Sequence, residues 1–180
     1  VAGVADSFRF VLKVDDCFMH DTKEAMVKMH TFTIGDTLLF TNCIFDEAYN
    51  EAILLRESTT GGGPTIEYLE VENCTFTKIG REALYLEFSN PVVRFDHCTF
   101  DSIAYRESKR IIYPKDVTDV QIKNCIFTNQ GGTFATSIEL FGNSSISYCD
   151  TFNITSVKLN GSATIGAGML DVDPLYTNPA

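Results

Sequence analysis

The sequence predicts an all-β fold, a right-handed parallel β-helix of about six coils. The main observation is a repeat of short segments that each centre on a cysteine, with successive cysteines 24 to 31 residues apart. A second observation is that apolar and polar residues alternate around these cysteines, as in a strand with one buried face. All the cysteines of the chain belong to this repeat: Cys17, Cys43, Cys74, Cys98, Cys125 and Cys149.

The segment before each cysteine is the first predicted strand of the repeat. Its alternation is clearest in residues 69–72 (LEVE) and 93–96 (VRFD). A polar or aromatic residue then precedes each cysteine, and asparagine in this place suits a tight corner because it tolerates left-handed backbone. These corner residues are Asp16, Asn42, Asn73, His97, Asn124 and Tyr148. An apolar residue stands two places after the first five cysteines: Met19, Phe45, Phe76, Phe100 and Phe127.

Each repeat carries a second predicted strand that begins near a glutamate. The clearest copies are residues 24–29, 51–56 and 82–87, and weaker copies are residues 107–112 and 136–140. The longest interval contains the Gly-rich stretch 58–64, which predicts a surface excursion. Residues 113–116 (YPKD) predict another corner.

A unit of about 26 residues cannot bury its apolar face alone, so the repeats must stack to close a continuous core. Stacking of this kind makes residues 1–180 a single β-helix domain, and we expect it to be part of a longer chain. A β-propeller is the structural alternative, but its blades need roughly 40 residues and four strands each.

The aligned cysteines are expected to be buried free thiols. Stacked residues lie near the strand spacing of about 4.8 Å, whereas a disulfide needs Cβ atoms about 3.8 Å apart. Unpaired cysteine packs as a small apolar residue. We therefore predict a column of thiols in the core and no disulfide framework.

The motif Asn-Cys-x-Phe at 42–45, 73–76 and 124–127 resembles the coils of the pectate-lyase-like right-handed β-helix superfamily. The ending at 173–180 (DPLYTNPA) is also similar to a segment common in such domains. This superfamily includes lyases of the chondroitinase B and alginate lyase group and β-helix domains of bacterial glycan-utilisation systems. The resemblance implies a secreted or cell-surface location in a bacterium, with a polysaccharide or oligosaccharide as partner.

Basic and aromatic residues in the second strands and beside them predict a binding patch for an acidic glycan. Tyrosine rings can stack on sugars while cations attract uronate groups. The expected patch consists of Arg56, Arg81, Tyr85, Arg106, Lys109 and Arg110, and Tyr105 and Tyr113 are further stacking candidates. The alternative interpretation is a face of solvated charges. None of these residues matches the catalytic pattern of the lyases, so the catalytic residues are unknown.

Glutamates that recur at the start of the second strand suggest either a calcium site or ion pairs. They are Glu24, Glu51, Glu82 and Glu107. Like charges repel when they stack, and Ca²⁺ between Glu51 and Glu82 would relieve this repulsion. Pairing with Lys23, Arg81 and Arg106 is the alternative. No other cofactor is expected.

The net charge of −10 argues against nucleic acid, whose phosphates need a basic surface. No run of 18 apolar residues is present, so we expect no membrane span. The main hypothesis is a carbohydrate-binding or structural β-helix module of a bacterial polysaccharide-utilisation protein. The alternatives are a polysaccharide lyase that acts by β-elimination on a uronate-containing glycan, or a trimmed part of one, and a stalk-like spacer of an adhesin.

Overall fold

The computed structural model describes residues 11–29, 36–56, 66–87, 91–115, 117, 119–131 and 136–174. Its secondary structure over these residues consists of strands that pair in parallel. The part of the chain that the structure describes contains no helix able to cross a membrane. The excursion expected at 58–64 lies outside the described residues, as does most of the segment 173–180.

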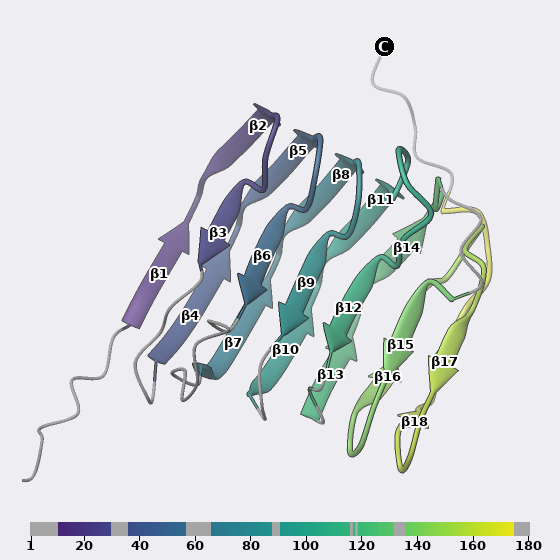
Figure 1. The fold of residues 1–180 in the computed structure, drawn as a ribbon. Coiled ribbons are helices and arrows are strands. Elements are labelled where there is room, and N and C mark those ends of the chain that lie inside the picture. Colours follow the sequence, from purple (N-terminus) through teal and green to yellow (C-terminus); the bar gives the residue numbers. More distant parts are fainter. Residues whose placement is uncertain are drawn as a thin grey trace, which may run out of the picture.

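Three parallel sheets form the walls of the fold, and each of the first five coils adds one strand to each sheet (Figure 1). Sheet A contains β1 (Val11–Asp15), β4 (Asp36–Thr41), β7 (Ile66–Glu72), β10 (Val92–Asp96), β13 (Asp119–Lys123), β16 (Ser145–Ser147) and β18 (Thr164–Ile165). Sheet B contains β2 (Phe18–Thr22), β5 (Ile44–Ala48), β8 (Thr75–Ile79), β11 (Thr99–Ile103) and β14 (Ile126–Thr128). Sheet C contains β3 (Val27–Met29), β6 (Ile53–Arg56), β9 (Leu84–Glu87), β12 (Ile112–Lys115), β15 (Ile138–Leu140) and β17 (Val157–Leu159).

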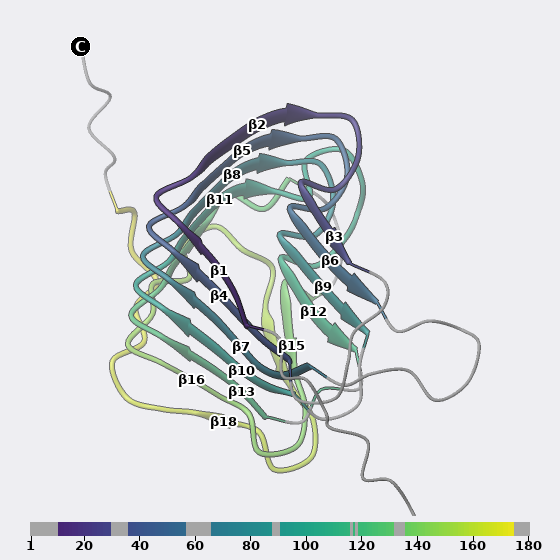
Figure 2. The ribbon, with the colours of Figure 1, turned by 90° about the vertical axis from the view of Figure 1, so that its left-hand side faces the viewer.

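The chain winds as a right-handed parallel β-helix. Viewed from the β1 end in Figure 2, it passes clockwise from sheet A through sheet B to sheet C while it moves away from the viewer. Sheet C has six strands, which confirms the predicted number of coils, and β18 begins a seventh turn. Each coil of the regular part has three strands, one more than the two that the sequence pattern defined clearly.

The corner between sheets A and B turns through left-handed backbone at the residue before each cysteine, as predicted. The φ angles there lie between 52° and 55°, at Asp16, Asn42, Asn73, His97, Asn124 and Tyr148. Side chains tie successive corners together, since the Asn42 amide donates to the Asp15 carboxylate at 3.1 Å and the Asn124 amide donates to Asp96 at 2.8 Å.

A second left-handed corner lies four residues after each cysteine, and the sequence did not reveal it. Its φ angles run from 50° to 60°, at Asp21, Glu47, Lys78, Ser102, Asn129 and Asn153. The position is constant but the residue type is not, so composition gave no indication of it. In the first four coils this residue is the last but one of the sheet B strand.

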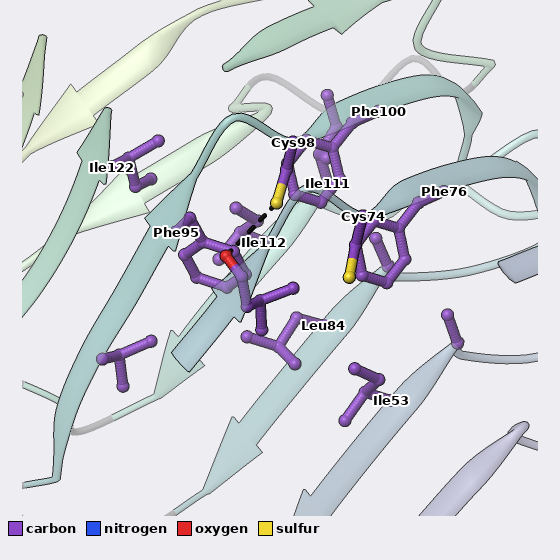
Figure 3. Close-up of a cluster of buried hydrophobic side chains, with 14 of the residues drawn as sticks. Ile53, Cys74, Phe76, Leu84, Phe95, Cys98, Phe100, Ile111, Ile112 and Ile122 are labelled. Carbon is purple, nitrogen blue, oxygen red and sulfur yellow. Dashed lines mark hydrogen bonds between the residues drawn. The ribbon is translucent and has the colours of Figure 1, made fainter. Parts of the chain in front are cut away.

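The interior is a stack of similar layers, and Figure 3 shows those of coils three and four. The predicted phenylalanine column is continuous: ring centroids lie 4.6 Å apart for Phe45 and Phe76, 4.9 Å for Phe76 and Phe100, and 4.7 Å for Phe100 and Phe127. All four rings are fully buried. Burial of large apolar side chains in register is the main source of stability in this architecture.

The cysteine column is present as free thiols, which confirms that prediction. Each thiol lies close to the carbonyl two residues before it, at 3.2 Å for Cys74 and Glu72 and 3.3 Å for Cys98 and Asp96. Burial raises the pKa of the Cys43 thiol. The Cys43 thiol is therefore protonated at neutral pH, donates within the core and has little nucleophilic character.

Thiol titration should distinguish the first coil from the rest. Five of the cysteines are buried, whereas Cys17 is only partly buried. In the native protein we expect a disulfide-exchange reagent to label Cys17 first and the others only at the rate of unfolding. In denaturant without reductant all six should react, and a smaller number would reveal disulfides and contradict the free column.

Two segments differ from their expected positions in coil four. Only the last residue of the expected strand 107–112 is in a strand, because β12 begins at Ile112. The segment 113–116, expected as a corner, supplies Tyr113 and Lys115 to that strand. Pro114 is tolerated there although it cannot donate to a sheet ladder, since the pairing of β12 with β15 is limited to Ile112 and Ile138.

Candidate functional site

In the first five coils, the connections vary in length at the two edges of sheet C but not between sheets A and B. The corner between sheets A and B has two residues in each of the first five coils, for example 42–43 and 97–98. From sheet C to the next strand of sheet A the connection varies from three residues (116–118) to nine (57–65). From sheet B to sheet C it grows from four residues (49–52) in coil two to eight (104–111) in coil four. Insertions in a solenoid gather around its binding face, so sheet C is the candidate face.

Two tyrosines from neighbouring strands form the centre of the outer face of sheet C. Tyr85 of β9 and Tyr113 of β12 are register partners, and their rings meet edge to face at 5.3 Å. Both are half-buried. Leu54 of β6 is the next partner in the same column, and it is almost fully buried. The column therefore forms an apolar strip whose accessible part is the two tyrosine rings of coils three and four.

Ion pairs border this strip at the C-terminal ends of the strands. Arg56, Glu87 and Lys115 are partners in one column across β6, β9 and β12. The Glu87 carboxylate is 3.0 Å from the Arg56 guanidinium, and it also bonds the Lys115 ammonium. Hydrogen bonding and attraction from Lys115, together with Arg56, lower the pKa of Glu87. Desolvation raises the pKa of Tyr85, so its hydroxyl remains a neutral donor and acceptor.

A second set of ion pairs continues the face toward coil six. Arg110 lies 2.6 Å from Glu139, and its guanidinium stacks over the Tyr113 ring at 4.3 Å. Lys158 donates to the same carboxylate at 2.9 Å. Although burial raises the pKa of Glu139, its bonds to Lys158 and Asn160 and the charge of Arg110 hold that pKa below its usual value.

The structure distributes the six predicted patch residues over three places. Arg56, Tyr85 and Arg110 belong to the sheet C face just described. Arg81 and Lys109 lie in the corner between sheets B and C and contact Glu107 at 3.3 Å and 3.7 Å. Arg106 lies elsewhere on that edge, between two further tyrosines.

The Arg81 cluster contains the two glutamates that were expected to hold calcium. Glu51 and Glu82 occupy equivalent positions two residues before register partners in β6 and β9, and they are 4% and 2% exposed. The Arg81 guanidinium lies 2.8 Å from Glu51 and 3.9 Å from Glu82. Desolvation raises the pKa of Glu82, against the lowering effect of Arg81. In this geometry the Arg81 guanidinium, which was the alternative to calcium, contacts both glutamates.

The glutamates do not form one column. Counting from register partners in β3 and β6, Glu24 lies one residue out of step with Glu51. Glu107 is displaced by the insertion of coil four, although it still reaches Arg81. Within the described ranges no three histidine, cysteine or acidic side chains are placed to hold a metal ion.

Several residues of the face were not found from the sequence. Glu87 and Glu139 are the counterions of Arg56 and Arg110. Lys115 and Lys158 are further partners of these two carboxylates, and in the separate B–C corner Tyr49 contacts Arg106. The column of Arg56 and Glu87 could have been found, because both residues end an aligned second strand. The position of Lys115 could not, since the four-residue insertion before β12 hides its alignment.

Comparisons with known proteins found no relative: no family model matches the sequence, and no curated protein or solved structure matches the chain. The function must therefore be argued from the fold and the surface of this chain.

Proposed function

We propose that this chain is a glycan-binding β-helix module, with the saccharide lying on the outer face of sheet C. The observation that carries the proposal is the pair of tyrosines, Tyr85 and Tyr113, on sheet C. The connections at the edges of this sheet are the ones that vary in length. Half-buried tyrosines offer an apolar ring to a sugar face and a hydroxyl to its polar edge. Rigid strands hold both rings in place, so binding costs little ordering entropy.

The polar surroundings suit a ligand with many hydroxyl groups. Carboxylates of Glu87 and Glu139 accept hydrogen bonds, while Arg56, Lys115 and Lys158 donate them. Each carboxylate is shared by two cations, so this group keeps an excess of positive charge that can also accept the acidic groups of a glycan. The strands repeat at about 4.8 Å, which spreads the contacts along an extended ligand.

The wider assignment follows from the fold and the resemblance together. The parallel β-helix and the repeated Asn-Cys-x-Phe motif support membership of the pectate-lyase-like superfamily. On that basis we place the module in a secreted or cell-surface polysaccharide-utilisation protein of a bacterium. The engagement of Arg110 with Glu139 and of Lys109 with Glu107 favours binding over catalysis, because neither cation is free to act on a substrate.

Polysaccharide binding tests this proposal. Affinity electrophoresis in gels that contain neutral or acidic plant and algal polysaccharides should retard the protein, and calorimetry with oligosaccharides should give a dissociation constant. Replacing Tyr85 or Tyr113 by alanine should weaken binding by about tenfold, as expected when a stacking aromatic side chain worth about 1.4 kcal/mol is removed.

The control is Tyr68→Ala, which removes a tyrosine from the outer face of sheet A. It should leave the dissociation constant unchanged. Loss of binding in Tyr68→Ala with full binding in Tyr85→Ala would move the site to sheet A. Absence of binding to every polysaccharide would overturn the proposal.

A further inference from the structure

An arginine clamped between two exposed tyrosines forms a separate hollow at the edge between sheets B and C. The Arg106 guanidinium lies 4.3 Å from the Tyr49 ring centroid and 5.1 Å from that of Tyr105. Its Nε also donates to the Tyr105 hydroxyl at 2.8 Å. Tyr49 is 50% exposed and Tyr105 is 38% exposed. The clamp fixes a cation while leaving ring surface open to solvent.

The backbone of coil four produces this arrangement by crossing coil three. The corner residues Tyr105 and Arg106 hydrogen-bond to the carbonyls of Ile79 and Gly80 at 3.3 Å and 3.1 Å. Gly80 is required beneath them, because a β-carbon there would lie 2.0 Å from the Tyr49 carbonyl oxygen. The insertion therefore brings side chains of coil four against the corner of coil two. The insertion at 104–111 can pack this closely because Gly80 keeps the corner of coil three compact.

Arg106 differs in its contact partners from the other arginines that the structure describes. Arg56, Arg81, Arg94 and Arg110 each lie within 3.0 Å of a carboxylate. Among the residues that the structure describes, Arg106 has tyrosines as partners and no carboxylate at ion-pair distance. In a chain with a net charge of −10, its guanidinium keeps donors for a carboxylate that is not its own.

The rest of the hollow is polar. Its lining also includes Asp21, Thr22, Lys23 and Glu47 from the corners of coils one and two. Two carboxylates on that wall can accept hydrogen bonds from hydroxyl groups, and the Lys23 ammonium adds a second cation. A guanidinium binds carboxylate through two parallel hydrogen bonds, and an aromatic ring packs against C–H groups.

We propose that this hollow binds a hydroxycarboxylate, with the carboxylate on Arg106, the carbon skeleton against Tyr49 and the hydroxyl groups toward Asp21 and Glu47. A sugar acid and a smaller open-chain hydroxy acid share this chemistry. The inference does not rest on the proposed function, because none of these residues belongs to the sheet C face.

The test uses the whole chain, ¹⁵N-labelled, in NMR titrations with glucuronate, glycerate and glucose. Glucuronate should shift the amide signals of residues 49, 105 and 106, and glucose should bind at least about tenfold more weakly, because it lacks the group that takes a charge-assisted bond. Equal affinity for glycerate would identify the small hydroxy acid as sufficient, and weaker binding of glycerate would show that the sugar ring contributes.

Arg106→Gln should lower the affinity for glucuronate by about tenfold or more, and Arg106→Lys should restore only part of it because lysine lacks the planar fork. The control is Arg56→Gln, which alters the sheet C face and should leave this titration unchanged while affecting polysaccharide binding. No shift at the three residues, or equal affinity for glucose and glucuronate, would overturn the inference. Either result would leave the sheet C proposal standing.

Discussion

Replacing Phe100 by alanine is expected to lower the free energy of unfolding by about 3–5 kcal/mol. Phe100 is fully buried and stacks on Phe76 at 4.9 Å and Phe127 at 4.7 Å. It also contacts Phe95 edge to face at 5.9 Å. Deleting this ring opens a cavity in the middle of the column and removes three aromatic contacts, each of which adds to the burial term. The neighbouring coils hydrogen-bond on both sides and cannot collapse into the space.

Urea unfolding followed by circular dichroism measures this loss. The matched control is Phe18→Ala, because Phe18 starts a strand of the same sheet but is 60% exposed, and it should cost no more than about 0.5 kcal/mol. Phe100→Leu should fall between the two. Similar losses for Phe100→Ala and Phe18→Ala would show that the phenylalanine column is not the core of this protein.

The features of the fold that the sequence revealed are those in which one position demands one kind of side chain. The buried cysteine and the phenylalanine two places later each tolerate few residue types, so they recur visibly, and the left-handed residue was found because it stands directly before the cysteine. The second left-handed corner was missed because Asp21, Glu47 and Lys78 occupy it equally well. An exposed corner sets a backbone angle without selecting a side chain strongly.

The sheet C strand of coil four shows how an insertion defeats alignment by residue type. Glu107 resembles the glutamates that precede the earlier strands, and this likeness placed the strand five residues too early. In the structure, β12 begins at Ile112, which pairs with Leu84. Distance along the chain cannot locate a strand that follows a loop of variable length, whereas the buried alternation of Ile112 and Pro114 can.

The sequence predicted several charged residues of the candidate site but did not predict which residues they contact. Arg81 and Arg106 look alike in the sequence, since each directly precedes a glutamate. In the structure Arg81 lies among three carboxylates, whereas Arg106 lies between two tyrosine rings. The difference arises from contacts between separate coils. The sequence of a single coil therefore does not predict which partners its arginine has.

Replacing Arg81 by methionine is expected to destabilise the protein by about 3 kcal/mol at pH 7, near the lower end for loss of one member of a buried charge cluster. The substitution keeps the packing of the side chain but leaves Glu51 and Glu82 buried without their cation. Because the Arg81 side chain is 29% exposed, water screens part of the attraction and limits the loss. Thermal and urea unfolding would measure it.

The loss should depend on pH, because Glu82 has a raised pKa in the folded chain, chiefly from desolvation. As pH rises from the ordinary value of 4.5 toward the folded value, the unfolded chain releases the proton first, so stability falls. Arg81 opposes this shift in the native protein. Without Arg81 the pKa of Glu82 rises further, so the fall extends to higher pH and the defect of Arg81→Met is larger at pH 8 than at pH 5. Adding Glu82→Gln should remove much of this pH dependence, and a defect that is the same at both pH values would show that Arg81 stabilises the corner by packing alone.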